Sequence, residues 1–276
     1  MRFRVKIRAR HPILDRIIVI LVLLTILILL GKLALLIEQI SNVRKQSTLQ
    51  YMLQVALQPV GTTMYIWGGG WDDEDQTAGS TSTQMGLSAQ WENFASQQNA
   101  VYDFNNHRLE RENGLDCSGY VGWVMYNTFE TESGREGYVV TSTDMAKNYA
   151  DRGWGTYIEN PTEFLVGDIV SMDGHVWISM GTCADGSVLL VHSSPPGVSV
   201  CGTALEDGAE SMAVKIATKY MMTYHATWQE NYPNRSVSQE YLENVSLVRW
   251  NSTTMSDAGK LQALSAEEVI SLLLSR

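Results

Sequence analysis

An unbroken apolar run near the N-terminus divides the sequence into two parts of different character. Residues 17–37 read IIVILVLLTILILLGKLALLI, and only Thr25, Gly31 and Lys32 interrupt the run. At about 1.5 Å rise per residue, a helix over this run would be about 30 Å long, the thickness of the hydrocarbon core of a bilayer. The run is longer than the apolar region of a cleaved signal peptide, and no clear A-x-A site follows it. We therefore expect a single-pass transmembrane anchor over 17–37.

The charges on the two sides of this run predict its orientation. Residues 1–46 hold nine Lys and Arg against two acids, whereas the remaining 230 residues hold 11 bases and 28 acids. Six Lys and Arg against one acid precede Ile17, so by the positive-inside rule the N-terminus is expected in the cytoplasm and the acidic part outside the cell. A part with a formal charge of −17 is also a poor nucleic-acid-binding surface, because phosphates attract the opposite charge. No nucleic-acid partner is expected.

Helical patterns precede a run of strand patterns in the acidic part. Helices are expected over 38–57, 86–100, from residue 116, over 141–153 and over 206–228. Strands are expected over 164–172, 175–181, 187–194, 197–201 and 245–250, with DG and PPG turns among them. Ser265 and Glu268 form a capping-box pattern at the start of the last helix. This order is typical of an α+β fold with an antiparallel sheet.

Cys117 has a sequence environment that suits a reactive thiol. Asp116 can cap the helix that follows, which places Cys117 in its first turn. The positive end of the helix dipole and unpaired N–H groups would favour the thiolate there. The alternative is a buried structural cysteine, which is the more common fate of a lone cysteine.

Two of the five histidines stand at the ends of adjacent strands, and the hairpin register decides whether they meet. A tight turn at 185–186 would pair Ser179 with His192 and leave His175 about 13 Å away along the strand. A four-residue loop over 182–185 would set His175 directly opposite His192, roughly 5 Å away. A catalytic pair needs the second register, or a bulge that mimics it. A thiol at a helix start, a histidine on a strand and a polar partner on the next strand are the groups that thiol acyl transfer requires.

Four motifs occur in the order MYIWGGG, LDCSGYVGWVMY, GDIVSMDGHVWISMG and VLLVHSS. This set resembles the NlpC-type cell-wall endopeptidases, which are papain-like cysteine peptidases of bacteria, and the resemblance covers about residues 48–200. It implies a papain-like NlpC-type α+β domain, in which the helix bearing Cys117 packs on an antiparallel sheet bearing both histidines. It also implies hydrolysis of peptidoglycan stem peptides, usually after γ-D-glutamate and before a diamino acid.

The same resemblance implies roles for individual residues. Cys117 would be the nucleophile, His175 the base and His192 the group that orients the base. Oxyanion stabilisation or substrate binding would fall to Tyr65, Trp67, Asp116 and Ser118. For the last two, the helix cap and helix start are equally good interpretations.

Two segments depart from the family pattern. About forty residues, 72–113, separate the Y-x-W-G-G and D-C-S-G motifs, and this insertion is expected near the cleft as a lid, a substrate-selecting wall or a docking surface. The second departure is an aromatic-rich C-terminal extension over 203–256. Its packing against the domain is the simpler interpretation, and a glycan or partner surface is the alternative.

The remaining cysteines, Cys183 and Cys201, flank the strand that carries His192. Outside the cell they can form a disulfide, and two free thiols are the alternative. Cys117 with the two histidines can be drawn as a zinc site, but the resemblance implies a free thiolate. No metal and no cofactor are expected.

The predicted organisation is a cytoplasmic basic segment over 1–16, the anchor over 17–37, a linker over 38–47, the cysteine peptidase domain over 48–256 and a helical tail over 257–276. The predicted function is a membrane-anchored D,L-endopeptidase with a Cys-His-His triad, located in the bacterial cell membrane with its catalytic domain outside. Peptidoglycan is the expected partner, and a secretion or conjugation machine is a further one. Two alternatives stay open: a peptidoglycan amidase or an acyl or peptidyl transferase on the same triad, and a non-catalytic wall-binding scaffold.

Overall fold

The computed structural model describes residues 20–23, 25–26, 31–32, 47–72, 74–129 and 137–275. The chain divides into two compact units, Met1–Gln46 and Ser47–Arg276. The anchor predicted over 17–37 lies mostly outside the described residues. Among the residues that are described, no helix has both the length and the apolar character that crossing a membrane requires. The predicted fold class, which included such a helix, is wrong on this point.

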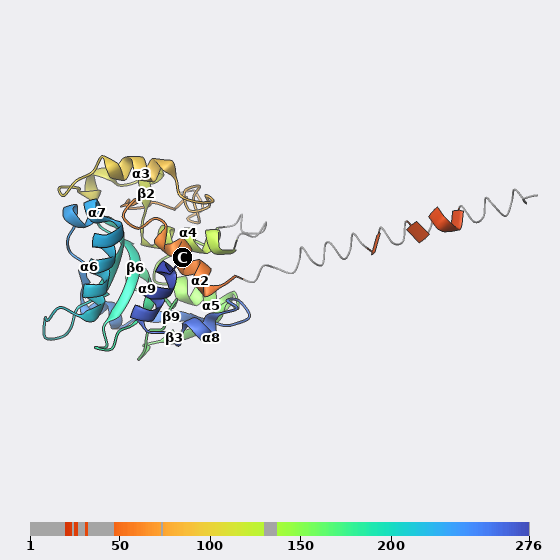
Figure 1. The fold of residues 1–276 in the computed structure, drawn as a ribbon. Helices are drawn as coiled ribbons and strands as arrows, with labels where there is room; N and C mark the ends of the chain where they lie inside the picture. The colour runs from red at the N-terminus through yellow and green to blue at the C-terminus, as the bar shows by residue number, and fades with distance from the viewer. Residues whose placement is uncertain are drawn as a thin grey trace, which may run out of the picture. The chain divides into compact units, whose positions relative to one another are not determined.

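In the described part of the chain, nine strands form one curled mixed sheet in the second unit (Figure 1). Its spatial order is β2 (Gly114–Leu115), β1 (Met64–Tyr65), β7 (Gly197–Thr203), β6 (Val188–Ser194), β5 (His175–Thr182), β4 (Ile169–Met172), β9 (Ser246–Trp250) and β3 (Gly155–Glu159), with β8 (Ser236–Val237) beside β7. The β1–β2 and β7–β8 pairs are parallel, and the other neighbours are antiparallel. The purely antiparallel sheet of the prediction is therefore also wrong.

The helices surround this sheet. They are α2 (Leu49–Leu57), α3 (Ala89–Ser96), α4 (Cys117–Phe129), α5 (Met145–Asp151), α6 (Met212–Tyr224), α7 (Ala226–Asn231), α8 (Ala258–Leu261) and α9 (Ala266–Leu274). The connections that the structure describes also hold the short 3-10 turns η1 (Phe104–His107), η2 (Arg111–Asn113) and η4 (Gln239–Leu242). The capping box at Ser265 and Glu268 is confirmed. The single helix predicted over 206–228 is broken at His225, where the backbone leaves the helical region (φ −140°, ψ 50°).

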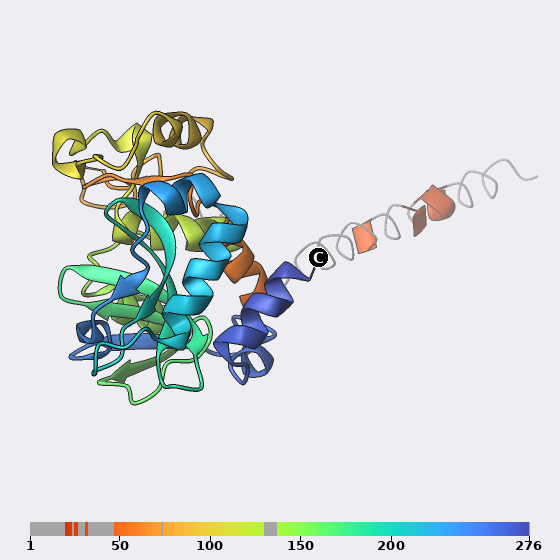
Figure 2. The ribbon, with the colours of Figure 1, turned by 60° about the vertical axis from the view of Figure 1, so that its left-hand side comes forward.

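The two faces of the sheet are buried in two separate cores. Successive side chains of a strand point to opposite faces, so Val176 and Ile178 of β5 enter the main core with α4, while Trp177 enters a second core with Leu190 and Leu247. Helix α4 packs between α2 and the β5–β6 pair. Figure 2 shows α6 lying along the sheet, where it contacts β7. Helix α4, which begins with Cys117, is therefore held by apolar contacts on both of its sides.

Glycines allow the Y-x-W-G-G and D-C-S-G motifs to approach each other. A Cβ atom on Gly119 would lie 2.0 Å from the carbonyl oxygen of Gly69, and one on Gly70 would lie 2.5 Å from the Cα atom of Gly119. These separations are too short for any side chain. The backbone N–H of Asp116 donates to the Gly69 carbonyl (2.9 Å). This contact sets the start of α4 against the loop that follows β1.

The insertion and the extension both belong to the second unit. The insertion supplies α3, η1 and η2, which lie near β1 and β2 at one end of the domain (Figure 1). The extension supplies α6, α7, β8, η4 and β9, and β9 enters the sheet between β4 and β3. Strand β3 was not expected from the sequence, since its five residues show no clear alternation. The extension therefore packs against the domain.

Candidate active site

Cys117 is the first residue of α4, and Asp116 caps this helix. One oxygen of the Asp116 carboxylate accepts hydrogen bonds from the backbone N–H of Gly119 (2.7 Å) and from the Ser118 hydroxyl (2.9 Å). The Ser118 hydroxyl in turn accepts from the indole N–H of Trp71 (3.0 Å). The contacts of Asp116 and Ser118 are thus those of a helix cap and its brace, which satisfy N–H groups that the first turn leaves unpaired.

Burial determines the protonation state of Cys117. The side chain is 7% exposed, and burial, reinforced by the Asp116 carboxylate, raises the pKa of the thiol to about 12. Backbone N–H groups at the start of α4 and at Val176 lower the pKa, but burial exceeds their effect. Burial likewise raises the pKa of Asp116 to about 6. The thiolate expected from the helix dipole is therefore not the resting form, and a base is needed to generate it.

The structure brings the two strand-end histidines together. The Nε2 atom of His175 lies 3.0 Å from the Nδ1 atom of His192, and the rings are 5.2 Å apart at an angle of 76°. Burial lowers the pKa of His175 to about 4 and holds the pKa of His192 well below its usual value. Both rings are therefore neutral, and one of the two facing nitrogens donates while the other accepts. The Nδ1 atom of His175 makes no hydrogen bond to another described residue.

The hairpin register that produces this contact is neither of the two considered from the sequence. Ser179 pairs with Leu190 and Thr182 with Val188, so the register shifts at a bulge between Ser179 and Thr182. Gly181 lies within this bulge at φ +104°, a backbone conformation that favours glycine. The bulge sets His175 diagonally across from His192 on the same face, rather than directly opposite. Diagonal neighbours are still close enough for long or aromatic side chains to touch.

The start of α4 lies near the start of β5. The backbone N–H of Val176, the residue after His175, is close enough to Cys117 to lower the pKa of the thiol. Because Val176 points into the main core with α4, its neighbour His175 points to the other face of the strand. The start of β5 therefore lies near the thiol with its backbone and contacts the second histidine with the His175 ring. Strand β5 is the element that links the three residues.

Tyr65 and Trp67 lie in and just after strand β1, which pairs with β2 directly before Cys117. Tyr65 pairs with Leu115 in the parallel β1–β2 ladder, two residues before Cys117. Burial raises the pKa of the Tyr65 hydroxyl, and the charges of Cys117 and Asp116 add to the rise, so the phenol is within electrostatic range of both. Trp67 is 44% exposed, and the guanidinium of Arg108 lies 4.0 Å above its ring. Trp67 thus presents an accessible aromatic surface near the site.

Tyr241 of η4 is a site neighbour that sequence reasoning missed. Its ring lies 5.4 Å from that of His175 and 5.8 Å from that of His192. Burial raises the pKa of its hydroxyl to about 12, and Cys201 and Cys117 contribute to the rise. Tyr241 therefore packs on the histidine pair from the extension. The only signal in the sequence was the aromatic content of that extension, which does not indicate which ring reaches the site.

A buried arginine lies behind the pair. Arg235 is 3% exposed and lowers the pKa of His192 through its positive charge. Its Nη2 atom donates to the Tyr232 carbonyl (2.6 Å), while Nε and Nη1 have no hydrogen-bond partner in the described residues. A fixed positive charge beside His192 disfavours a second positive charge on that ring.

Cys183 and Cys201 are free thiols in the structure, so the disulfide considered from the sequence is not formed. Cys183 belongs to the main core and Cys201 to the second core, on the other face of the sheet. The spacing of the two cysteines in the sequence did not show that their side chains lie on opposite faces of the sheet, because the bulge in β5 changes which face the residues after it point to. Within the described residues, no three or more His, Cys, Asp or Glu side chains gather as a metal site would require.

Comparisons of the chain with family models, with curated proteins and with solved structures gave no match.

Proposed function

We propose that this chain is a cysteine peptidase that hydrolyses peptide bonds in the stem peptides of peptidoglycan, acting as a D,L-endopeptidase. The observation that carries the proposal is the 3.0 Å contact from Nε2 of His175 to Nδ1 of His192. This contact leaves Nδ1 of His175 as the free basic nitrogen. The backbone N–H of Val176, the next residue on the strand, is close enough to Cys117 to lower the pKa of the thiol. The substrate class comes from the resemblance of the four motifs to the NlpC-type endopeptidases.

The proposed reaction begins with a neutral thiol and a neutral imidazole. Nδ1 of His175 takes the proton of Cys117 as the sulfur attacks the scissile carbonyl carbon, and His192 accepts from Nε2–H and orients the ring. The backbone N–H of Cys117 and the Tyr65 hydroxyl stabilise the oxyanion. His175 then protonates the leaving amine as the C–N bond breaks, which leaves an acyl-thioester. Water, deprotonated by His175, attacks the thioester, the C–S bond breaks, and the acid product leaves.

The test is digestion of purified peptidoglycan, with product masses measured by mass spectrometry. The intact chain should cut within the stem peptide, and Cys117→Ala should release no fragment. Cys117→Ala should also have the same thermal unfolding temperature as the wild type, which shows that its fold is intact. Cys183→Ala is the matched control, because this thiol lies in the main core away from the histidine pair, and it should keep the activity. Fragments released equally by Cys117→Ala would contradict the proposal.

The product masses also separate the other chemistries available to the same residues. An amidase would release whole stem peptides free of sugar, and a transferase would give products heavier than its substrate. A scaffold without activity would release no product from any peptidoglycan preparation. Because the substrate lies outside the cytoplasm, the proposal also places this domain there, which protease treatment of intact cells would check.

A further inference from the structure

The insertion packs on the Y-x-W-G-G motif, which lies against the start of α4. The hydroxyl of Tyr102 donates to the carbonyl of Tyr65 (2.7 Å), and the ring of Phe104 lies 5.4 Å from the Tyr65 ring, edge to face. Further along the chain, the backbone N–H of Leu109 donates to the carbonyl of Trp67 (3.0 Å). The insertion is therefore fixed against Tyr65, the residue to which the proposed reaction assigns the oxyanion.

This packing places an exposed arginine beside the motif. The guanidinium carbon of Arg108 lies 4.0 Å from the centre of the Trp67 ring, in a cation–π contact, and both side chains are exposed. The next residue, Leu109, adopts φ +67°, a conformation that residues other than glycine rarely adopt, and its N–H bonds to Trp67. Arg108 is therefore held in place by the Trp67 ring and by the turn that follows it.

The charge of Arg108 reaches the residues around Cys117. Burial raises the pKa of the Tyr65 hydroxyl, the charges of Cys117 and Asp116 add to the rise, and the charge of Arg108 opposes it. The Tyr65 hydroxyl is thus within electrostatic range of the thiol and of the guanidinium at the same time. A substrate group beside the thiol therefore experiences the positive charge of Arg108.

The guanidinium of Arg108 has no anionic partner in the part of the chain that the structure describes, and its N–H groups make no hydrogen bond there. The carboxylate nearest to it in sequence, Glu110, is engaged elsewhere. This carboxylate lies 3.0 Å from Nδ1 of His107 and accepts from the side-chain amide of Asn113 (3.0 Å). The charge of Arg108 is therefore available to an anion from outside the protein.

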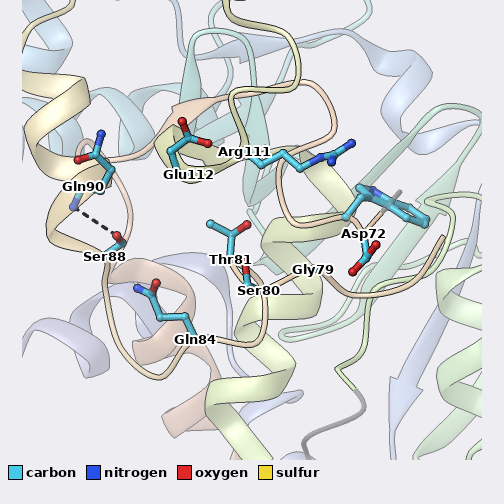
Figure 3. A pocket seen from close by; sticks show the side chains of 10 residues that line it. Asp72, Gly79, Ser80, Thr81, Gln84, Ser88, Gln90, Arg111 and Glu112 are labelled. Atoms are coloured by element: carbon cyan, nitrogen blue, oxygen red, sulfur yellow. Dashed lines mark hydrogen bonds between the residues drawn. The ribbon is translucent and has the colours of Figure 1, made fainter. Parts of the chain in front are cut away.

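The other arginine of the insertion is already in use. The Nε atom of Arg111 donates to the Gly68 carbonyl (2.9 Å). Figure 3 shows the Arg111 side chain among the residues that line a pocket of about 420 Å³, together with Asp72 and Glu112. Two carboxylates beside one guanidinium disfavour a further anion in that pocket. Of the two arginines of the insertion, Arg108 is therefore the one that can bind an anionic substrate.

We propose that Arg108 is a specificity-determining residue, which binds a free carboxylate of the substrate beside the scissile bond. This inference rests on the proposed function. A glutamate that is linked through its γ-carboxyl keeps its α-carboxylate free, and only the carbons of that same residue separate the α-carboxylate from the scissile carbonyl. A guanidinium can donate a pair of parallel N–H groups to a carboxylate, whereas a carboxamide offers a single acceptor oxygen and no charge. The insertion thus selects stem peptides whose glutamate is not amidated.

The experiment compares kcat/KM for synthetic L-alanyl-γ-D-glutamyl peptides with that for the same peptides carrying an α-carboxamide. Lysine or meso-diaminopimelate occupies the third position. The wild type should cleave the acid about tenfold better than the amide, because a hydrogen bond to a charged group is worth at least this factor. Arg108→Met keeps the length of the side chain and removes its charge, so the acid-to-amide ratio should fall to about one. Arg108→Lys keeps the charge and should keep part of the preference.

The matched control is Arg152→Met. Arg152 is also exposed and lies over aromatic rings, those of Tyr138 (5.4 Å) and Trp154 (5.5 Å), and its variant should keep the wild-type ratio. Equal cleavage of acid and amide by the wild type would overturn the inference. A loss in Arg108→Met that is the same for both peptides would overturn it too, because Arg108 would then only support Trp67. Cleavage of none of the peptides by the wild type would instead contradict the proposed function, and this inference with it.

Discussion

Cys117 and His175 are both held in their neutral forms by burial. The thiol has its pKa raised to about 12, and the imidazole has its pKa lowered to about 4. The helix dipole, worth roughly 0.3–1 kcal/mol at an exposed helix end, does not offset the loss of water around a sulfur that is 7% exposed. Both groups are therefore neutral at rest, and in the proposed reaction the thiolate and the imidazolium form only as the substrate reacts.

The first prediction concerns the reactivity of Cys117 without substrate. Iodoacetamide should alkylate this thiol more slowly near pH 8 than it alkylates free cysteine, because only the thiolate reacts and burial raises the pKa. The rate should still be rising above about pH 9, the range of an ordinary thiol. Peptide mapping by mass spectrometry gives the rate for the Cys117 peptide alone. A rate that levels off below pH 8 would show that the thiolate is the resting form.

The second prediction concerns the acid limb of activity. An ordinary histidine is protonated below about pH 6.5, but burial lowers the pKa of His175 to about 4. The base therefore stays neutral down to this value, and kcat/KM should persist at about pH 5 and fall as the pH drops through the lowered pKa. The pH profile of the free enzyme measures this limb. A midpoint near 6.5 would mean that His175 is solvated and is not held as described.

At the scale of elements, the contact between two glycine-bearing motifs places the start of α4 and with it Cys117. Gly119 of α4 lies against Gly69 and Gly70 of the loop after β1, with no room for a Cβ atom. The two motifs are therefore one structural unit, although the insertion separates them in sequence.

Gly119→Ala should consequently destabilise the fold by about 1–3 kcal/mol, the usual cost of forcing a methyl group into a packed site. It should also lower kcat more than it raises KM, since it displaces the start of α4. Gly259→Ala in α8 is the matched control, because nothing lies within 4 Å of its added Cβ atom. In a helix this change should be neutral or stabilising by up to about 1 kcal/mol. The two variants are compared by thermal unfolding. Equal changes in stability would show that the close contact at Gly119 does not account for the loss of stability.

The β5–β6 hairpin shows which features of the fold could be predicted from the sequence and which could not. Alternating apolar residues and the Asp-Gly turn were enough to predict both strands and the common face of His175 and His192. The register was not predictable, because it depends on a bulge at Gly181 that local propensity does not reveal. Tyr241 was not predictable either, since a 3-10 turn far along the chain reaches the site only through tertiary packing.

At the scale of the whole molecule, the extension completes the sheet. Strand β9 pairs with β4 on one side and with β3 on the other. Arg249 of β9 places its Nη2 atom 2.7 Å from the carboxylate of Asp168, which is fully buried before β4. Helix-then-strand order in the sequence predicted a sheet, but pairing between residues about 90 apart follows from no local pattern.

The fourth prediction is that a chain ending after Thr203 does not fold cooperatively. It lacks β9, so β3 loses its strand partner, β4 loses one neighbour, and the second core loses Val245 and Leu247. Thermal unfolding followed by circular dichroism should show no sigmoidal transition. A chain ending after Leu274, the last residue of α9, is the control and should unfold as the full chain does. A cooperative transition in the shorter chain would show that the extension is dispensable for folding.

The late position of β9 also has a consequence for biosynthesis. A ribosome releases the chain from its N-terminus, so Cys117, His175 and His192 emerge before Tyr241 and before the strand that joins β4 to β3. A nascent chain thus carries Cys117, His175 and His192 before the sheet that aligns them is complete. If the proposed function holds, activity is expected only after translation of the domain is nearly complete.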